Sequence, residues 1–218
     1  MGKNKDIREA VQAELLFDPL VDDSAIEVQN IEGDVRLNGS VPSYPQYLEA
    51  ADAARRVDGV KKVHNHLTVN LPDRARRDDA MLTTAANNAL LWAVTVPEGV
   101  TASAHDGDVT LTGSVGYNSE RVAAEAVVAG LTGVRGIKDE IDISQDADAD
   151  PVDVQFLVMS ALARYALLDD SEVTVVLDGN DVTLLGHTRT WAEHDAVVAA
   201  AWMADGVYRV HDHIVITG

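Results

Sequence analysis

The chain of 218 residues contains no cysteine. Without a thiol it can form no disulfide, no thiolate nucleophile and no zinc site with cysteine ligands. Basic residues are scarce as well: 17 Lys and Arg stand against 36 Asp and Glu, so the formal net charge is −19. Nucleic acids and anionic membranes attract clusters of basic residues. The charge balance therefore disfavours both as general partners, and we expect no nucleic-acid partner.

Long hydrophobic segments are also missing. Residues 1–9 pass straight from a basic beginning into charged residues, whereas a secretory signal peptide needs about 7–15 apolar residues there. The longest nearly uncharged segment, Met81–Ala104, is interrupted by polar residues and Pro97. Spanning a bilayer as a helix takes about 20 continuous apolar residues. We therefore expect a cytoplasmic protein, with 46% hydrophobic residues available for packed cores.

What the chain does have is internal repetition. The segment GDVRLNGSV at 33–41 recurs as GDVTLTGSV at 107–115 and, more loosely, as NDVTLLGHT at 180–188. The offsets are 74 and then 73 residues. Each copy has a further Gly-Val pair, 20 residues after the glycine inside the repeated segment, at 59–60, 133–134 and 206–207. Two landmarks at constant spacing in three copies predict three tandem domains.

Each copy shows the same order of predicted elements. A helical pattern comes first, with apolar residues three and four apart. Two short strands follow, joined by a turn rich in Gly, Asp and Asn, and then a second helix, the Gly-Val turn and a third strand. The apolar helical positions are Ile7, Val11 and Leu15; Met81, Leu82, Ala85, Ala86, Ala89 and Leu90; and Phe156, Met159, Leu162 and Ala163.

This order predicts an α+β fold of three tandem αββαβ domains, at residues 5–70, 78–144 and 151–217. Strands one and two of each domain form an antiparallel hairpin, and a right-handed helical crossover makes strand three parallel to strand two. The result is a three-stranded mixed sheet with two helices packed on one face. If Val35, Leu37 and Leu67 face the helices, alternate residues such as Arg36 and His64 face outward.

The repeated motifs resemble the BON domain (bacterial OsmY and nodulation), and the three copies cover nearly the whole chain. Copies two and three carry Asp139 and Asp212 where copy one has an asparagine. The resemblance implies a non-enzymatic binding module without a cofactor, related to envelope and osmotic-stress proteins for which phospholipid or protein binding has been proposed. The residues that carry it in copy one are Val35, Leu37, Gly39, Gly59, Val60, Val63, Asn65, Leu67 and Val69.

Copy three differs from the other two on the outward face of its sheet. Its outward positions include Val176, Leu185 and Val215, whereas the outer faces of copies one and two are polar. An exposed apolar face of this kind is a candidate contact surface. We predict that another copy or another chain covers it, so a protein partner or self-association is the expected interaction.

The basic run Arg74, Arg76 and Arg77 lies in the segment between copies one and two, among three aspartates. It is either a salt-bridge cluster at a linker and helix start or a site for phosphate or a lipid headgroup. The net charge is −4 for residues 1–72, −7 for 73–149 and −8 for 150–218. Copy one and the arginine run are therefore the least acidic region, and the place where a phospholipid membrane would bind.

Two histidine pairs, His64 with His66 and His211 with His213, occupy equivalent places in copies one and three. Residues two apart on a strand point to the same face, so each pair could supply two ligands of a metal site that still needs a third. Copy two has Lys138 and Glu140 there. The alternative interpretation is an ordinary polar strand face.

Catalysis finds little support in the sequence, which has no nucleophile-elbow Gly-x-Ser-x-Gly and no phosphate-binding loop. Trp92, Trp191 and Trp202 fall in helical segments, which favours packing in a core or between domains. Our leading hypothesis is a stress-associated, non-enzymatic protein that binds a protein, itself included, or a phospholipid surface. The alternative is an ion or metal sensor for K⁺, Ca²⁺ or Zn²⁺ that uses acidic loops, backbone carbonyls or the histidine pairs.

Overall fold

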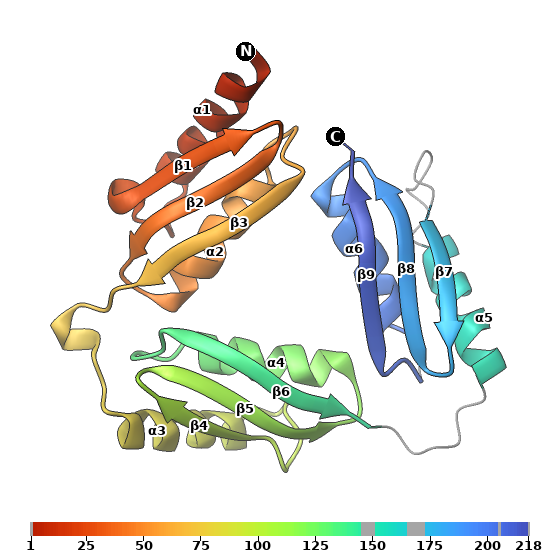
Figure 1. Cartoon of the computed structure of the whole chain (residues 1–218). Coiled ribbons are helices and arrows are strands. Elements are labelled where there is room, and N and C mark those ends of the chain that lie inside the picture. Colours follow the sequence, from red (N-terminus) through yellow and green to blue (C-terminus); the bar gives the residue numbers. More distant parts are fainter. Residues whose placement is uncertain (1, 145–150, 165–172, 205, 218) are drawn as a thin grey trace.

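The structure is a computed structural model that describes residues 2–144, 151–164, 173–204 and 206–217. The segment predicted to link the second and third copies, 145–150, lies outside these residues. The chain forms three similar units, each with two helices and a three-stranded sheet (Figure 1). The predicted α+β fold of three αββαβ repeats is confirmed.

The elements follow the same order in each unit. Domain 1 contains α1 (Gly2–Phe17), β1 (Ile26–Ile31), β2 (Asp34–Val41), α2 (Tyr44–Arg55) and β3 (Lys62–Val69). Domain 2 contains α3 (Asp79–Trp92), β4 (Thr101–His105), β5 (Asp108–Val115), α4 (Asn118–Ala129) and β6 (Gly136–Ile143). Domain 3 contains α5 (Pro151–Arg164), β7 (Val173–Asp178), β8 (Asp181–Thr188), α6 (Trp191–Trp202) and β9 (Arg209–Ile216). Short 3₁₀ turns cover Asp23–Ala25 and Asp73–Ala75.

The sheets have the predicted connectivity. The second strand lies in the middle of each sheet, antiparallel to the first strand and parallel to the third. The two-residue turn Asp106-Gly107 has positive φ at both positions, 51° and 84°, as a tight hairpin between right-twisted strands requires. The register sets Val35 opposite Val63 and Leu37 opposite Asn65, so the helix-facing positions of the strands line up across the sheet.

Each domain has its own core between the sheet and the helices. In domain 1, Val35 and Leu37 of β2 are fully buried against Val11 and Leu15 of α1 and a run of alanines on α2. Small residues on α2 let this helix lie close to the sheet, while the larger side chains of α1 fill the rest of the space. The period-two pattern of the strands and the helical spacing of Val11 and Leu15 therefore account for the core.

The glycine inside the repeated segment is required by the backbone. Gly39, Gly113 and Gly186 have φ angles of 119°, 138° and 130°, in a region that residues with side chains rarely adopt. A Cβ atom on Gly39 would stand 1.9 Å from the carbonyl oxygen of Ala25. Glycine at this position lets the first strand begin close against the second, which explains why it recurs.

A polar residue recurs on the helix-facing side of the third strand and ties the second helix to the sheet. The side-chain oxygens of Asn65, Asp139 and Asp212 each accept a hydrogen bond from the backbone N–H two residues later. The other end of each side chain meets the second helix of its own domain. The partners there are the Tyr47 carbonyl at 2.7 Å, Arg121 at 3.4 Å and His194 at 2.7 Å.

No helix in the described part of the chain is both long enough and apolar enough to span a membrane.

Candidate interaction surfaces

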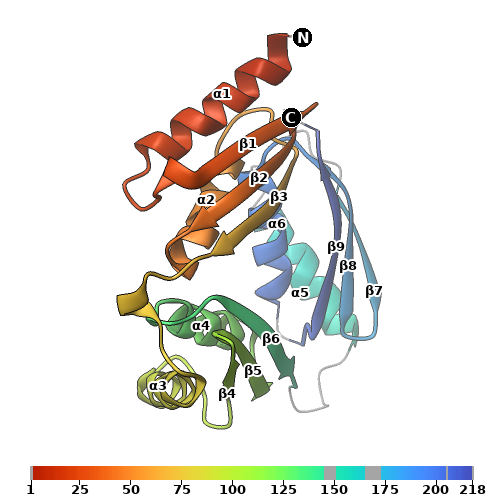
Figure 2. The same ribbon diagram turned by 60° about the vertical axis from the view of Figure 1, so that its left-hand side comes forward.

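The three domains stand around a common centre, with α2, α4 and α6 on the inner side (Figure 1). The helices of domain 3 lie on the side of its sheet that faces domain 1, so the outer face of this sheet looks away from the other two domains (Figure 2). The molecule therefore offers two kinds of surface: the outer sheet faces, and the contacts between domains.

The outer face of the third sheet is apolar at three positions. Val176, Leu185 and Val215 are 47%, 39% and 61% exposed. We refer to these three residues as the outer apolar face. The equivalent positions are polar in the other domains, with Gln29, Asn38 and Thr68 in domain 1 and Ser103, Thr112 and Asp142 in domain 2.

The histidine pairs lie on outer sheet faces, as the strand parity predicts. The rings of His64 and His66 are nearly parallel, 7° apart in orientation, with centroids 6.1 Å apart. In domain 3, Nε2 of His211 lies 3.9 Å from a carboxylate oxygen of Asp181. Within the described residues, no three His, Cys, Asp or Glu side chains gather as a metal ion would require. The metal-binding role of His64, His66, His211 and His213 stays a prediction.

The arginine run makes its contacts with the linker backbone. Arg77 donates to the carbonyl oxygens of Arg74 and Arg76 at 2.9 and 2.8 Å. Arg76 donates to the Leu71 carbonyl at 3.3 Å and lies 3.6 Å from a carboxylate oxygen of Asp73. All three side chains are exposed. These contacts hold the turn between domains 1 and 2, and the lipid-headgroup role of the run stays a prediction.

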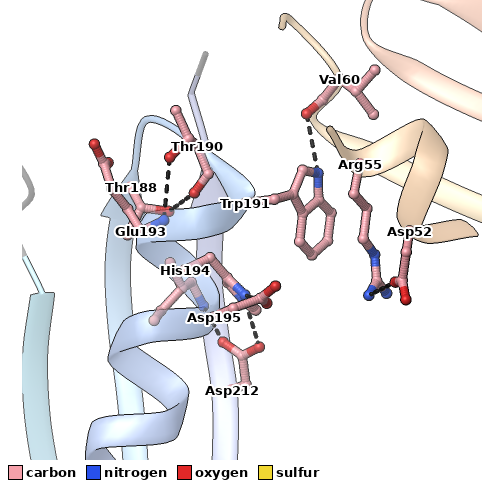
Figure 3. Close-up of polar contacts among 11 residues, drawn as sticks. Asp52, Arg55, Val60, Thr188, Thr190, Trp191, Glu193, His194, Asp195 and Asp212 are labelled. Atoms are coloured by element: carbon pink, nitrogen blue, oxygen red, sulfur yellow. Dashed lines mark hydrogen bonds and ion pairs between the residues drawn. The ribbon is translucent and has the colours of Figure 1, made fainter. Parts of the chain in front are cut away.

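Trp191, the first residue of α6, joins domain 3 to domain 1. Its indole N–H donates to the carbonyl oxygen of Val60, 3.1 Å away. The guanidinium of Arg55, at the end of α2, lies 4.7 Å from the centre of the indole ring, and Arg55 also pairs with Asp52 (Figure 3). A cation over the face of a tryptophan is attracted by the ring quadrupole. We call this set of contacts between Trp191, Arg55 and Val60 the Trp191 latch.

His194 supports Trp191 from inside domain 3. It is 9% exposed, and its ring meets the indole edge-on at 5.1 Å (Figure 3). Its two ring nitrogens contact carboxylates, Nδ1 with Asp195 at 2.9 Å and Nε2 with Asp212 at 2.7 Å. Thr190 caps the helix by accepting from the N–H of Glu193 at 3.2 Å. The orientation of Trp191 is therefore fixed by the start of α6 and by the third strand of its own domain.

Two further contacts between domains also begin in the first turns of second helices. Tyr44, the first residue of α2, packs against the core of domain 2 as well as its own. Burial raises the pKa of Tyr44, and the nearby Glu125 carboxylate adds to the rise. Burial likewise raises the pKa of Glu125. Between domains 2 and 3, the guanidinium of Arg121 on α4 lies 5.0 Å from the ring centre of Trp202.

Sequence reasoning found only part of these contacts. Trp191 and Trp202 do pack between domains, but Trp92 is 84% exposed, so the expectation of a packed position is wrong for it. Trp92 ends α3 two residues beyond Leu90, the last buried residue of that helix. Alignment of the three repeats could have indicated the contact position, because it places Tyr44, Asn118 and Trp191 at one equivalent position. Aromatic residues at two of the three starts of second helices mark a contact position.

The family model of the BON domain matches three segments, residues 3–70, 78–145 and 151–218. Together these segments make up nearly the whole chain, and the chain therefore belongs to the BON domain family. Osmotically-inducible protein Y of Escherichia coli (strain K12) is 40% identical over 57 residues. That match covers 26% of this chain and 28% of the E. coli protein, so the two share a segment and not a full length.

Two solved structures with detectable likeness come from type III secretion systems. CdsD, a structural protein of the type III secretion system of Chlamydia trachomatis, is 14% identical, covering 97% of this chain and 92% of that one, with a TM-score of 0.26. The periplasmic domain of the inner membrane protein PrgH from S. typhimurium is 12% identical, covering 88% and 95%, with a TM-score of 0.22. Likeness at these TM-scores supports no inference about arrangement or partners.

Proposed function

We propose that this chain is a stress-associated, non-catalytic binding protein, and that the outer apolar face is its contact surface for a protein partner. The exposure of Val176, Leu185 and Val215 supports the proposal best. The same positions are polar in both other domains, so the fold itself does not require apolar residues there. Among the residues that the structure describes, neither other domain covers this face, which looks outward in Figure 2. An exposed apolar cluster with a polar rim is typical of a binding surface.

A protein suits this surface better than a lipid bilayer does. Residues 150–218 carry three Arg and no Lys against eleven Asp and Glu, a net charge of −8. Anionic membranes repel such a domain, because binding there relies on clusters of Lys and Arg. A protein surface can pair an apolar patch with charges of complementary sign around it. The occupant that can be tested directly is the same face of a second copy, which meets itself in a twofold contact.

Sedimentation velocity over a range of chain concentrations tests this. We expect the native chain to associate, and the variant Val176→Thr, Leu185→Thr, Val215→Thr to need a concentration about tenfold higher to reach the same degree of association. Threonine keeps the strand preference but removes the apolar surface. The matched control is Gln29→Thr with Asn38→Thr on the equivalent face of domain 1, which should associate like the native chain. A native chain that is monomeric at every concentration would overturn self-association through this face.

The similarity to an osmotically inducible protein supports the stress assignment. It is tested by following the abundance of this protein after a rise in external osmolarity. An unchanged level would count against the assignment.

Two roles predicted from the sequence have separate tests. Binding of phospholipid at Arg74, Arg76 and Arg77 predicts co-sedimentation with anionic phosphatidylglycerol vesicles that is lost when the three arginines are replaced by glutamine. Metal binding at the histidine pairs predicts calorimetric heat on adding Zn²⁺ that is lost in His64→Ala with His66→Ala or in His211→Ala with His213→Ala. Absence of vesicle binding or of heat in the native chain contradicts the role concerned.

A further inference from the structure

The contacts that the starts of the second helices make with other domains run in one direction around a closed cycle. Residues in the first turn of a second helix contact the next domain in each case: Tyr44 on domain 2, Arg121 on domain 3 and Trp191 on domain 1. Such a contact is heterologous, because the surface at the start of one helix meets a different surface on the neighbour. Heterologous contacts close into rings or continue into open chains. Three domains close the ring within this one chain.

The contact between domains 3 and 1 differs from the other two because no linker joins these domains directly. Domains 1 and 2, and domains 2 and 3, are consecutive in sequence, so covalent connection keeps each pair together. The polar contacts described between domains 3 and 1 are those of the Trp191 latch. The latch is therefore the place where the ring can open without unfolding a domain.

The seam at the latch is loosely packed. A cleft of ≈820 Å³ lies along it, lined from domain 1 by residues such as Arg55 and Asp58 and from domain 3 by residues such as Trp191 and Ala192. A cleft of this size between the two domains means that they touch along only part of the seam. Nε of Arg55 is buried and has no hydrogen-bond partner among the described residues. An unpaired buried donor weakens the contact further.

We propose that the Trp191 latch exchanges between copies of this chain. When the ring opens, domain 3 exposes Trp191 and domain 1 exposes the surface around Arg55 and Val60, and each fits the other surface on a second open copy. Two open chains then form a head-to-tail dimer of six domains that keeps every contact of the closed monomer. Dilute chains favour closure, because domains 1 and 3 of one chain are held at a high effective concentration. Exchange therefore grows with chain concentration.

This proposal does not depend on the proposed function. The outer apolar face points away from the latch, and the two surfaces share no residue. Replacing Val176, Leu185 and Val215 by threonine should leave latch exchange unchanged.

Single cysteines can detect the exchange, because the native chain has none. Asp58→Cys and Ala192→Cys introduce exposed thiols on opposite sides of the cleft. The two single variants, distinguished by mass, are unfolded together in urea, refolded as a mixture at rising concentration and treated with a bifunctional maleimide. We expect a cross-linked pair containing one chain of each kind, with a yield that rises with concentration. The double variant in one chain should cross-link internally at low concentration.

Substitution of the latch identifies the surface responsible. Trp191→Ala should lower the initial rates of internal and between-chain cross-linking together, by about tenfold, because both products use the same contact. Trp191→Phe keeps a ring beneath Arg55 but loses the N–H donor to Val60. Its cross-linking rates should lie between those of the native latch and those of Trp191→Ala. Trp92→Ala is the control, since Trp92 is exposed and lies outside the seam. A far-UV circular dichroism melt checks that each variant folds.

Three results would overturn the proposal. Internal cross-linking without any between-chain product at the highest concentration means that the latch does not exchange. Absence of internal cross-linking in the double variant means that the latch does not form. A between-chain product that survives Trp191→Ala at full rate means that another surface joins the chains.

Discussion

Domains 1 and 3 share a fold and a strand register, yet they differ on the outer face of the sheet and at the inward polar position of the third strand. The outer face carries Gln29, Asn38 and Thr68 in domain 1 and three apolar residues in domain 3. The inward polar position pairs neutral Asn65 with a backbone carbonyl in domain 1, and Asp212 with a deeply buried histidine in domain 3. The positions that the two domains share determine the fold, and the positions that differ determine which groups each domain contacts.

The largest loss of stability should come from replacing the glycine that recurs in all three domains. Gly39→Ala forces a Cβ atom to within 1.9 Å of the Ala25 carbonyl oxygen, at a φ of 119°. We expect a loss of at least about 3 kcal/mol in the free energy of unfolding of domain 1, because clash and strain add. Urea denaturation followed by hydrogen exchange in β2 measures it.

The control for this substitution is Gly116→Ala. Its φ lies outside the left-handed region, and the nearest atom to a new Cβ is a side-chain oxygen of Glu120 at 3.6 Å. This variant should stay within about 0.5 kcal/mol of the native chain. Equal losses in the two variants would show that the close approach of the first strand does not explain the glycine.

A smaller difference should separate the inward polar positions. Asp212→Ala removes a carboxylate from the buried His194 ring, and we expect a loss of about 2 kcal/mol. Asn65→Ala removes a hydrogen bond between neutral groups, with an expected loss of about 1 kcal/mol. Hydrogen exchange in β9 and in β3 reports the two domains separately. Equal losses would mean that the histidine and carboxylate in domain 3 add nothing to the shared tie between helix and strand.

The smallest effect concerns the contact between domains 1 and 2 and depends on pH. Burial raises the folded-state pKa of Glu125 above its ordinary value of 4.5. Between the unfolded and folded pKa values the folded chain binds more protons, so stability falls as pH rises through this window. Glu125→Gln removes that loss, so its Tm should exceed the native Tm at pH 7 and approach it below pH 4.5. Thermal melts across this range measure the difference.

The exposed Glu98 provides the comparison for the pH experiment. Glu98→Gln removes the same charge from an exposed loop position and so controls for the change in net charge. If both variants behave alike, net charge and not burial at the domain contact explains the result.

The fold could be predicted because the same pattern of core and turn residues occurs three times along the chain. Val35, Leu37 and Gly39 recur with constant spacing, and one core-facing pattern that occurs three times leaves little freedom in the element order. The two-residue hairpin at Asp106-Gly107 follows from residues that tolerate positive φ.

The contacts between domains could not be predicted in the same way. They depend on residues that differ from copy to copy, such as Tyr44 and Trp191, and on where a rigid domain places its neighbour. Trp191 and Trp92 both belong to helical segments, and only the tertiary arrangement separates a seam residue from an exposed one. The seam cleft, formed by residues more than a hundred positions apart in sequence, left no local pattern.

The one-way cycle of contacts also sets the number of domains that one chain can use. In each domain the start of the second helix contacts the next domain, and with three domains the third contact returns to the first. A chain with two copies would leave one helix start and one helix end unfilled, and a fourth copy would find no vacant place in the ring. Deletion or duplication of a single repeat is therefore expected to change the assembly state of the protein rather than its length alone.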